Sequence, residues 1–300
     1  MASVRIHADD FGLTNGINNR IRLCWQQGLL HSVSIIPNGY AFDEAIQDYL
    51  SNDIKVQVHL NFVEGYALSP LSASSFFALP SGRFHQSFAS LFWKSSTASK
   101  NTKKQMKIAI QHEIKAQILK VKPFIKPNEL LRVDSHQHVH MIPLFFDALC
   151  DVVNELGIDY IRIPSENIPI AEFFSHQPAS FFNSGWMKVL LLSRLSGYAH
   201  QRIKQTRARY NSAFIGIIST GQMNLDVIEI LYRHIQAHLK TNDELEILLH
   251  PGKANLDEKS YWDDYPHLKD YYFSAYRDHE ADVILSDKLK SWYNQIILPS

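Results

Sequence analysis

The chain has 300 residues, of which 45% are apolar, 12% aromatic and 20% charged, a composition that supports a sizeable core and excludes a disordered protein. Its 30 Lys and Arg residues balance 30 Asp and Glu residues. This zero formal net charge excludes a protein whose main task is to wrap nucleic acid. We therefore expect no nucleic-acid partner and a small-molecule substrate.

Short runs of β-branched residues alternate with helical patterns along the chain. The expected strands are residues 3–8, 32–37, 54–60, 130–135, 160–164, 213–219 and 245–250. The expected helices are residues 16–28, 103–122, 143–156 and 224–239. Repeated βα units favour a parallel sheet. About seven strands, with no glycine-rich turn after the first, favour an α/β barrel-like closure over a Rossmann sheet.

Two stretches interrupt this alternation, residues 63–102 and 164–185. Loops of this length are usually lids or substrate walls when they are ordered. The sequence contains no internal repeat, low-complexity tract or convincing linker. We therefore expect a single domain over residues 1–300 with these two loops inserted.

The cellular location is predicted from the cysteines and from the apolar runs. Cys24 and Cys150 lie far apart in helical patterns, so they form neither a disulfide framework nor a thiolate metal site. The N-terminal segment has no secretory pattern, and residues 186–195 are too few and too charged to span a bilayer. We expect a soluble cytoplasmic protein without a transmembrane segment. Peripheral membrane contact and a homodimer are both compatible with the sequence.

Charged or titratable side chains follow several of the predicted strands. They are Asp9, Asp10, His59, Asp134, His136, Arg162 and His250. Parallel α/β folds build their sites at the carboxyl ends of strands, so these side chains are expected to converge.

Two imidazoles and one carboxylate from separate strands match a catalytic zinc site and also suit other divalent ions, Mg²⁺ among them. Neighbouring side chains at a strand end point in different directions, so one of the adjacent acids Asp9 and Asp10 can bind a metal while the other serves as a base. A metal lowers the pKa of bound water, a carboxylate accepts its proton, and a further histidine can protonate the leaving group. The pattern is typical of metal-assisted hydrolysis.

The segment "DSHQHVH" at 134–140 holds more candidate ligands than one ion can use. Its polar residues share a face only while the chain is extended, and Pro143 predicts that the chain turns into a helix. Some of Asp134, His136, His138 and His140 are therefore expected to orient a ligand or to line the pocket. Simpler structural interpretations also apply, because Asp9 and Asp10 could form a turn and helix cap, and the histidines could lie on a half-solvated strand.

At this point the sequence resembles the YdjC family of carbohydrate deacetylases, which includes the chitooligosaccharide deacetylases. The likeness is carried by "ADDFGLTNGIN", "SVSIIPNG" with Asn38, "VHLNFVEG", "EIKAQI", "VDSHQHVHMIP", "IRIPSE", "LLHPG" and "YRDHEADVILSD", which occur in family order between residue 4 and about residue 287. The combination of "ADDFG" with "DSHQHVH" is specific.

The resemblance implies a distorted TIM-like barrel that uses one divalent metal ion to remove an acetyl group from an N-acetylated amino sugar such as N-acetylglucosamine. Zn²⁺ is the ion expected at this site. It implies Asp10, His59 and His136 as metal ligands. It implies Asp9 as the base and His250 as the acid that protonates the amine. Arg162 is similar in place to a family arginine that orients the base or a substrate oxygen; Asn38, His138, His140 and Asp134 are expected to contact the substrate or the ligands.

The sequence departs from the family pattern at Asn255, where many relatives have an acid. This change raises the question of what keeps His250 protonated, and Asp257 is a candidate substitute. The segment "ARYNSAFIGIISTGQM" also resembles the branch of the family that is associated with hopanoid lipid biosynthesis. That likeness implies a glycolipid substrate and an apolar entrance to the active site near a membrane surface.

Two other functions stay open at this point. A metal-dependent phosphoesterase would use similar ligands but would need more cations or a second metal around the phosphate. A catalytically decayed carbohydrate-binding protein is hinted at only by Asn255.

Overall fold

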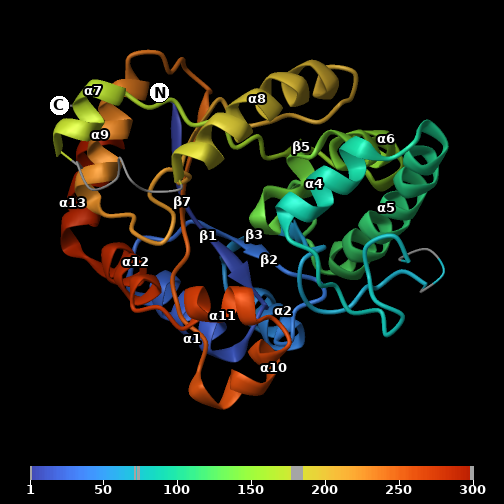
Figure 1. The fold of residues 1–300 in the computed structure, drawn as a ribbon. Coiled ribbons are helices and arrows are strands. Elements are labelled where there is room, and N and C mark those ends of the chain that lie inside the picture. Colours follow the sequence, from blue (N-terminus) through green and yellow to red (C-terminus); the bar gives the residue numbers. More distant parts are fainter. Residues whose placement is uncertain (1, 71, 73–74, 177–184, 298–300) are drawn as a thin grey trace.

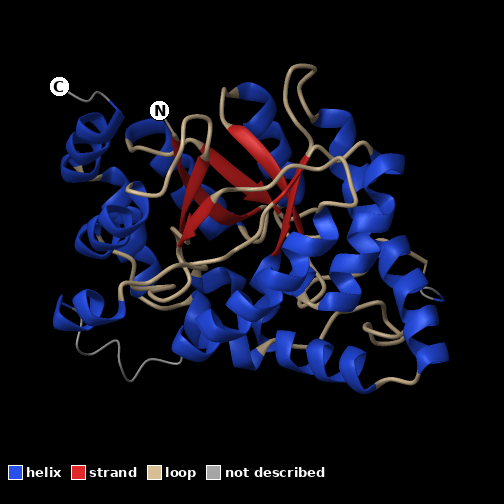
Figure 2. Cartoon of the chain, turned by 90° about the horizontal axis from the view of Figure 1, so that it is seen from above, coloured by secondary structure: helices blue, strands red, loops and turns tan. Residues whose placement is uncertain are grey.

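The computed structural model describes residues 2–70, 72, 75–176 and 185–297. Seven parallel strands form one curled sheet in the order β5-β4-β3-β2-β1-β7-β6 (Figures 1 and 2). They are β1 (Ser3–Phe11), β2 (Ser32–Ile35), β3 (Lys55–Leu60), β4 (Arg132–Ser135), β5 (Tyr160–Ile161), β6 (Ala213–Ile215) and β7 (Glu244–Leu249). Each lies where the sequence predicts a strand, and the distorted TIM-like barrel is confirmed.

The two edges of the sheet, β5 and β6, are joined by the chain just before β6. Arg209 pairs with Tyr160 in a parallel bridge, and its carbonyl accepts the Ile161 N–H at 2.9 Å. The side chain of Asn211 then imitates a strand: its Oδ1 accepts the Ile163 N–H at 2.7 Å and its Nδ2 donates to the Ile163 carbonyl at 2.8 Å. This seam closes the barrel with few hydrogen bonds.

The inner face of the barrel is polar, whereas barrel interiors are usually filled by branched apolar residues. His7 on β1 contacts Ser32 and Ser34 of β2 at 2.7 and 2.8 Å, and Gln57 of β3 donates to Asp134 of β4 at 3.4 Å. The alternate residues of β1, such as Ile6, are fully buried in the apolar core cluster. The alternation of the strands therefore separates an apolar layer from a hydrogen-bonded interior.

Helices surround the sheet (Figure 2). They are α1 (Asn15–Gln27), α2 (Phe42–Ser51), α4 (Phe88–Thr97), α5 (Lys100–Val121), η1 (Lys122–Phe124), η2 (His136–Met141), α6 (Pro143–Leu156), α7 (Ile170–His176), α8 (Gly185–Ile203), α9 (Leu225–Gln236), η4 (Leu256–Glu258), α10 (Lys259–Asp263), α11 (Pro266–Tyr272), α12 (Tyr276–Leu285) and α13 (Asp287–Ile297). The four predicted helices correspond to α1, α5, α6 and α9. Helix α5 begins three residues earlier than predicted because Ser99 caps it, accepting the Thr102 N–H.

The two inserted stretches are partly helical. Residues 63–102 contain α4 and the start of α5, and residues 164–185 contain α7, with 177–184 outside the described residues. Cys24 and Cys150 are both buried and free, in α1 and α6. Within the described ranges, no helix combines the length and the apolar run that crossing a membrane requires. The single-domain division stays a prediction.

Candidate active site

The adjacent acids Asp9 and Asp10 lie in an irregularity of β1. The register between β1 and β2 shifts between Ala8 and Phe11, and Asp10 has a φ of 72°. A bulge with a left-handed residue breaks the strict alternation of a strand, so two neighbouring side chains can serve one site. Both carboxylates are buried, and both line the same cavity.

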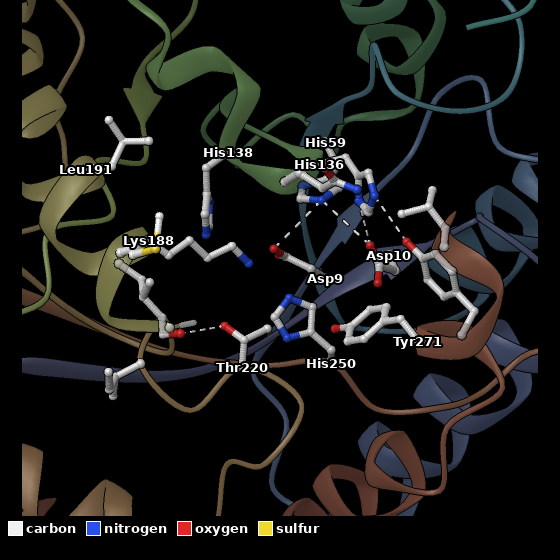
Figure 3. Close-up of a pocket in the computed structure, with 17 residues that line it drawn as sticks. Asp9, Asp10, His59, His136, His138, Lys188, Leu191, Thr220, His250 and Tyr271 are labelled. Carbon is white, nitrogen blue, oxygen red and sulfur yellow. Dashed lines mark hydrogen bonds and ion pairs between the residues drawn. The ribbon is translucent and has the colours of Figure 1, made fainter. Parts of the chain in front are cut away.

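Asp10, His59 and His136 form a cluster of buried side chains whose ligand-type atoms all lie within 4.8 Å of one another. His59 lies at the end of β3 and His136 begins η2, directly after β4, so the ends of β1, β3 and β4 supply the cluster. Oδ1 of Asp10 lies 4.0 Å from Nε2 of His59 and 2.9 Å from Nδ1 of His136. Figure 3 shows the three side chains converging at one end of the cavity.

Nε2 of His59 is buried without a hydrogen-bond partner among the described residues, and it faces Oδ1 of Asp10 at 4.0 Å, which is also in ion-pair contact with His136. An unsatisfied buried polar atom costs about 1–3 kcal/mol, so a nitrogen without a partner that faces a carboxylate oxygen indicates a missing binding partner. A cation at about 2.0–2.2 Å from oxygen and imidazole nitrogen would satisfy both. The residues present therefore fit one divalent metal ion.

Each histidine of the cluster is held by a carboxylate on its other nitrogen. His59 Nδ1 lies 2.6 Å from Asp134 Oδ1, and His136 Nε2 lies 2.9 Å from Glu64 Oε1. Tyr272 donates its hydroxyl proton to Glu64 at 3.1 Å and also lies 3.1 Å from His136 Nε2. Such carboxylate–histidine pairs fix the ring orientation and raise the basicity of metal ligands.

The carboxylate of Asp10 is divided between two tasks. Arg277 of α12 donates from Nη2 to Oδ2 at 2.9 Å, which leaves Oδ1 for the cluster. Burial opposes ionisation, but His136 and Arg277 hold the pKa of Asp10 well below its usual range. For His136, burial is likewise outweighed, because Glu64 and Asp10 raise its pKa to about 10.

Asp9 is held by Arg162 rather than by the cluster. Nη1 of Arg162 donates to both oxygens of Asp9 at 3.0 and 2.9 Å, and Nη2 donates to Oδ1 at 3.0 Å. Burial would raise the pKa of Asp9, but Arg162 and His59 hold it well below its usual range. Oδ2 of Asp9 lies 3.7 Å from Nε2 of His59, so this carboxylate borders the candidate metal position.

Arg162 itself lies fully buried among three carboxylates. Besides Asp9, its Nη2 lies 2.7 Å from Asp134 and its Nε lies 2.5 Å from Glu246 of β7. His7, Asp9 and Asp134 also form a group with metal-ligand spacing. The guanidinium bridges Asp9 and Asp134 and supplies the positive charge there, so we assign no second ion to this group.

His250 follows β7 and lines the cavity opposite the histidines of the cluster (Figure 3). Its Nδ1 lies 3.6 Å from Oε2 of Glu280, and Oε2 accepts the backbone N–H of His250 at 2.5 Å. Asn255 instead caps η4, where its N–H donates to Glu258 at 2.8 Å, and Asp257 is exposed. The carboxylate beside His250 is therefore Glu280.

The histidines of "DSHQHVH" separate because the chain turns sharply after His136. Gln137 and His138 have φ values of 51° and 57°, so the segment is not a half-solvated strand. His138 lines the cavity, and burial and Lys188 hold its pKa well below the usual value. His140 faces away: Ser135 Oγ lies 2.6 Å from its Nδ1, and its Nε2 donates to the Arg162 carbonyl at 2.8 Å.

Asn38 does not line the cavity. Its Nδ2 donates to the carbonyls of Glu64 and Tyr66 at 3.3 and 3.1 Å, so it holds the loop that carries Glu64. The adjacent Gly39 permits this arrangement, since a Cβ there would lie 2.1 Å from the Gly12 carbonyl oxygen.

The cavity has a volume of about 790 Å³ and two contrasting ends. Opposite the cluster, the wall is mostly apolar and comes from α8 and the loop after β6. It comprises Met187, Leu191, Ile217 and Ile218, with Lys188 and Thr220 among them. The carboxylate of Glu166 fixes this wall by accepting the N–H groups of residues 216–218 at 2.6, 3.1 and 2.7 Å.

Sequence reasoning missed four residues that support the site: Glu64, Tyr272, Arg277 and Glu280. None lies at the end of a predicted strand, so the strand-end criterion could not select them. The only signal was that Glu64 lies within "VHLNFVEG" and that Arg277 and Glu280 lie within "YRDHEADVILSD".

A family model and several relatives match this chain, and the family model matches nearly all of it. The model of the family described as "YdjC-like protein" matches residues 3–295. A carbohydrate deacetylase of Mus musculus is 22% identical over 97% of this chain and 90% of its own length. A carbohydrate deacetylase of Vibrio parahaemolyticus is 32% identical over 58% of this chain and 61% of its own length. A chitooligosaccharide deacetylase of Citrobacter koseri is 28% identical over 70% of this chain and 81% of its own length.

Among solved structures, a protein of Enterococcus faecalis provisionally named a cellobiose-phosphate cleavage protein superposes with a TM-score of 0.64. The superposition covers 98% of this chain and 94% of the other, at 16% sequence identity. This likeness shows the shared fold.

Proposed function

We propose, because this chain belongs to the YdjC-like protein family, that it is a metal-dependent hydrolase that removes the acetyl group from an N-acetylated amino sugar. The names of the carbohydrate deacetylases to which it is similar support this reaction. The observation that carries the proposal is the cluster of Asp10, His59 and His136 in one cavity with Asp9 and His250.

The proposed metal ligands are Asp10 Oδ1, His59 Nε2 and His136 Nδ1. Two imidazoles and one carboxylate suit Zn²⁺ better than Mg²⁺, which prefers oxygen ligands. When bound, the ion would supply Lewis acidity to the amide carbonyl and to the attacking water. Asp134, Glu64 and Arg277 keep the three ligands oriented.

Asp9 is the proposed proton acceptor for the attacking water. Its lowered pKa keeps the carboxylate ionised near neutral pH but makes it a weak base. The attacking water must therefore be unusually acidic for Asp9 to accept its proton. Arg162 engages both oxygens and so holds the carboxylate in one orientation at the border of the cluster.

His250 is the proposed acid. The amide nitrogen must take up a proton before the C–N bond can break, because an amide anion is too poor a leaving group. His250 lies in the same cavity as Asp9, and the two side chains come from the neighbouring strands β1 and β7. A base and an acid are thus available to one bound amide.

Two observations argue against the alternative functions. A two-metal phosphoesterase would need a second ion, whereas Arg162 bridges Asp9 and Asp134 at the other candidate group. A decayed binding protein would have no need to keep a buried histidine nitrogen that has no partner among the described residues, as at His59 Nε2. Both arguments favour a working single-metal hydrolase.

The apolar wall supports an apolar group on the sugar, which would make the substrate a glycolipid. Met187 and Leu190 of α8 are 77% and 64% exposed, so the apolar surface continues outward from the cavity along this helix. Leu191→Asp should therefore raise KM for an alkyl glycoside of N-acetylglucosamine more than for the free sugar. Equal changes in the two KM values would refute the glycolipid substrate.

The deacetylase proposal is tested by acetate release. The apo protein is reloaded with single metals and given free, oligomeric and lipid-linked N-acetylglucosamine, with Asp9→Asn as the control. Metal-dependent release that the substitution abolishes would establish the reaction and name the substrate class. A protein that binds metal but releases no acetate from any substrate would overturn it.

A further inference from the structure

Glu280 is a fully buried carboxylate that serves two loops at once. Oε2 accepts the backbone N–H of His250 at 2.5 Å, and Oε1 accepts the N–H of Met223 at 3.0 Å. It stands on α12, one turn after Arg277, which holds Asp10. One helical turn thus reaches both the candidate metal cluster and the candidate acid.

The ring of His250 has one nitrogen directed to protein and one left for the cavity. Nδ1 is buried and has no hydrogen-bond partner in the described part of the chain, and Glu280 Oε2 lies 3.6 Å from it. The two ring nitrogens lie on different edges of the imidazole, so an Nδ1–H directed at the carboxylate leaves Nε2 for a bound substrate. Catalytic hydrogen bonds are often long without substrate and shorten in the complex.

The other acids that sequence reasoning considers for this task do not reach His250. Asp257 is exposed, and Asn255 is used as a cap. Among the described residues, the carboxylate within 4.0 Å of the His250 ring is that of Glu280.

We propose that Glu280 is the positioning residue of the acid: it binds Nδ1–H of His250 and so directs Nε2–H at the departing amine. This inference rests on the proposed deacetylation. In the step itself the C–N bond breaks, the nitrogen keeps the electron pair, and the proton passes from Nε2 to that nitrogen. His250 ends neutral, with its remaining proton on Nδ1 facing Glu280, while the hydroxyl of the attacking water stays on the acetyl carbon as acetic acid, which releases its proton to solvent and becomes acetate.

The test compares two substrates that differ in their need for an acid. An N-acetylated amino sugar releases an amine that must be protonated, whereas 4-nitrophenyl acetate releases a stable phenolate. With the metal-loaded full chain, Glu280→Gln should lower kcat for the amide about 10–100-fold with KM nearly unchanged. Its kcat for the ester should stay within about twofold of wild type.

Glu258→Gln is the matched control. Glu258 is also buried and also accepts two backbone N–H groups, from Gly16 at 3.0 Å and Asn255 at 2.8 Å, but it does not contact His250. This variant should leave the ratio of amide to ester turnover unchanged. Equal loss of both activities in Glu280→Gln, or no loss of either, would overturn the proposal.

A double-mutant comparison separates positioning from folding. In a His250→Asn background, adding Glu280→Gln should cause little further loss of amide turnover, whereas independent effects would multiply and refute the proposal. If Glu280→Gln does not fold, Glu280→Asp, whose carboxylate is one methylene shorter, should show the same split between substrates. Absence of amide turnover in the wild-type chain, by contrast, would refute the deacetylase proposal itself.

Discussion

Arg277 donates to Oδ2 of Asp10 at 2.9 Å, and the other oxygen of that carboxylate faces His59 at 4.0 Å and His136 at 2.9 Å. The arginine therefore limits Asp10 to a single free oxygen and compensates part of the negative charge of the site. A ligand held in this way needs no reorientation when an ion binds.

The first prediction concerns this arginine. Arg277→Met should weaken binding of Zn²⁺ by about 10–100-fold, because Asp10 loses the partner that orients it. Titration calorimetry on the apo protein measures the change. Arg20→Met is the control, since Arg20 lies at 3.5 and 3.4 Å from Asp278 and Asp282 of the same helix without reaching the cluster. Equal affinities in Arg277→Met and wild type would contradict the role.

The second prediction concerns stability in the presence of the metal. Zn²⁺ at about 100 times its dissociation constant should add about 2.7 kcal/mol to the free energy of unfolding, or roughly 5 °C in Tm. His59→Asn should abolish this increase because it removes a ligand. Thermal unfolding with and without chelator is the measurement. A variant that keeps the full increase would show that the ion binds elsewhere.

The third prediction separates Asp9 from Asp10. Asp9→Asn should lower kcat for acetate release by about 10²–10⁴-fold, because the proton acceptor is lost, while the affinity for the metal changes little. Asp257→Asn, at an exposed position after β7, should leave kcat unchanged. If Asp9→Asn instead abolished metal binding, Asp9 would have to be counted among the ligands.

The fourth prediction is a pH dependence of folding away from the site. Burial, with Arg5 and Lys55, lowers the pKa of His31 from 6.5 to about 4. The unfolded chain then takes up this proton first, so the contribution of His31 is fully present above pH 6.5 and is lost as the pH falls toward 4. One pKa unit is worth about 1.4 kcal/mol, which limits the loss to roughly 3 kcal/mol.

His31→Asn tests this contribution. The amide oxygen can keep the hydrogen bond that His31 Nδ1 accepts from the Ile6 N–H at 3.0 Å. Urea unfolding of the metal-free protein at pH 7 and pH 4.5 should show a smaller decrease for His31→Asn than for wild type. His279→Asn, at an exposed position, should follow the wild type. Parallel decreases in all three proteins would rule the contribution out.

Much of the sheet follows from the sequence, because β-branched runs and alternation mark each strand. The polar residues at strand ends could be foreseen to converge, and His59 and Asp10 do so. Two backbone features could not be foreseen. The bulge at Asp10 and the left-handed turn at Gln137 and His138 contain no glycine, and they depend on packing around the site.

The supporting residues were hidden for a different reason. Arg277 and Glu280 lie about 25–30 residues beyond the last strand on a helix with little amphipathic pattern, and their contacts arise only when α12 docks on the barrel. The substitution at Asn255 suggested a weakened acid, whereas the structure supplies Glu280 from another element. A missing residue in one segment thus says little until the neighbouring segments are placed.

The seam between β5 and β6 is the weakly bonded part of the barrel, so the sequence near it can change more freely than the sequence within the sheet. The candidate metal cluster stands on β1, β3 and β4, inside the continuous ladder of the sheet, while the apolar wall comes from α8 and residues 217–220, on either side of the seam. Insertions or substitutions near the seam disrupt few hydrogen bonds. The choice of substrate can therefore diverge in this architecture while the reaction chemistry is preserved.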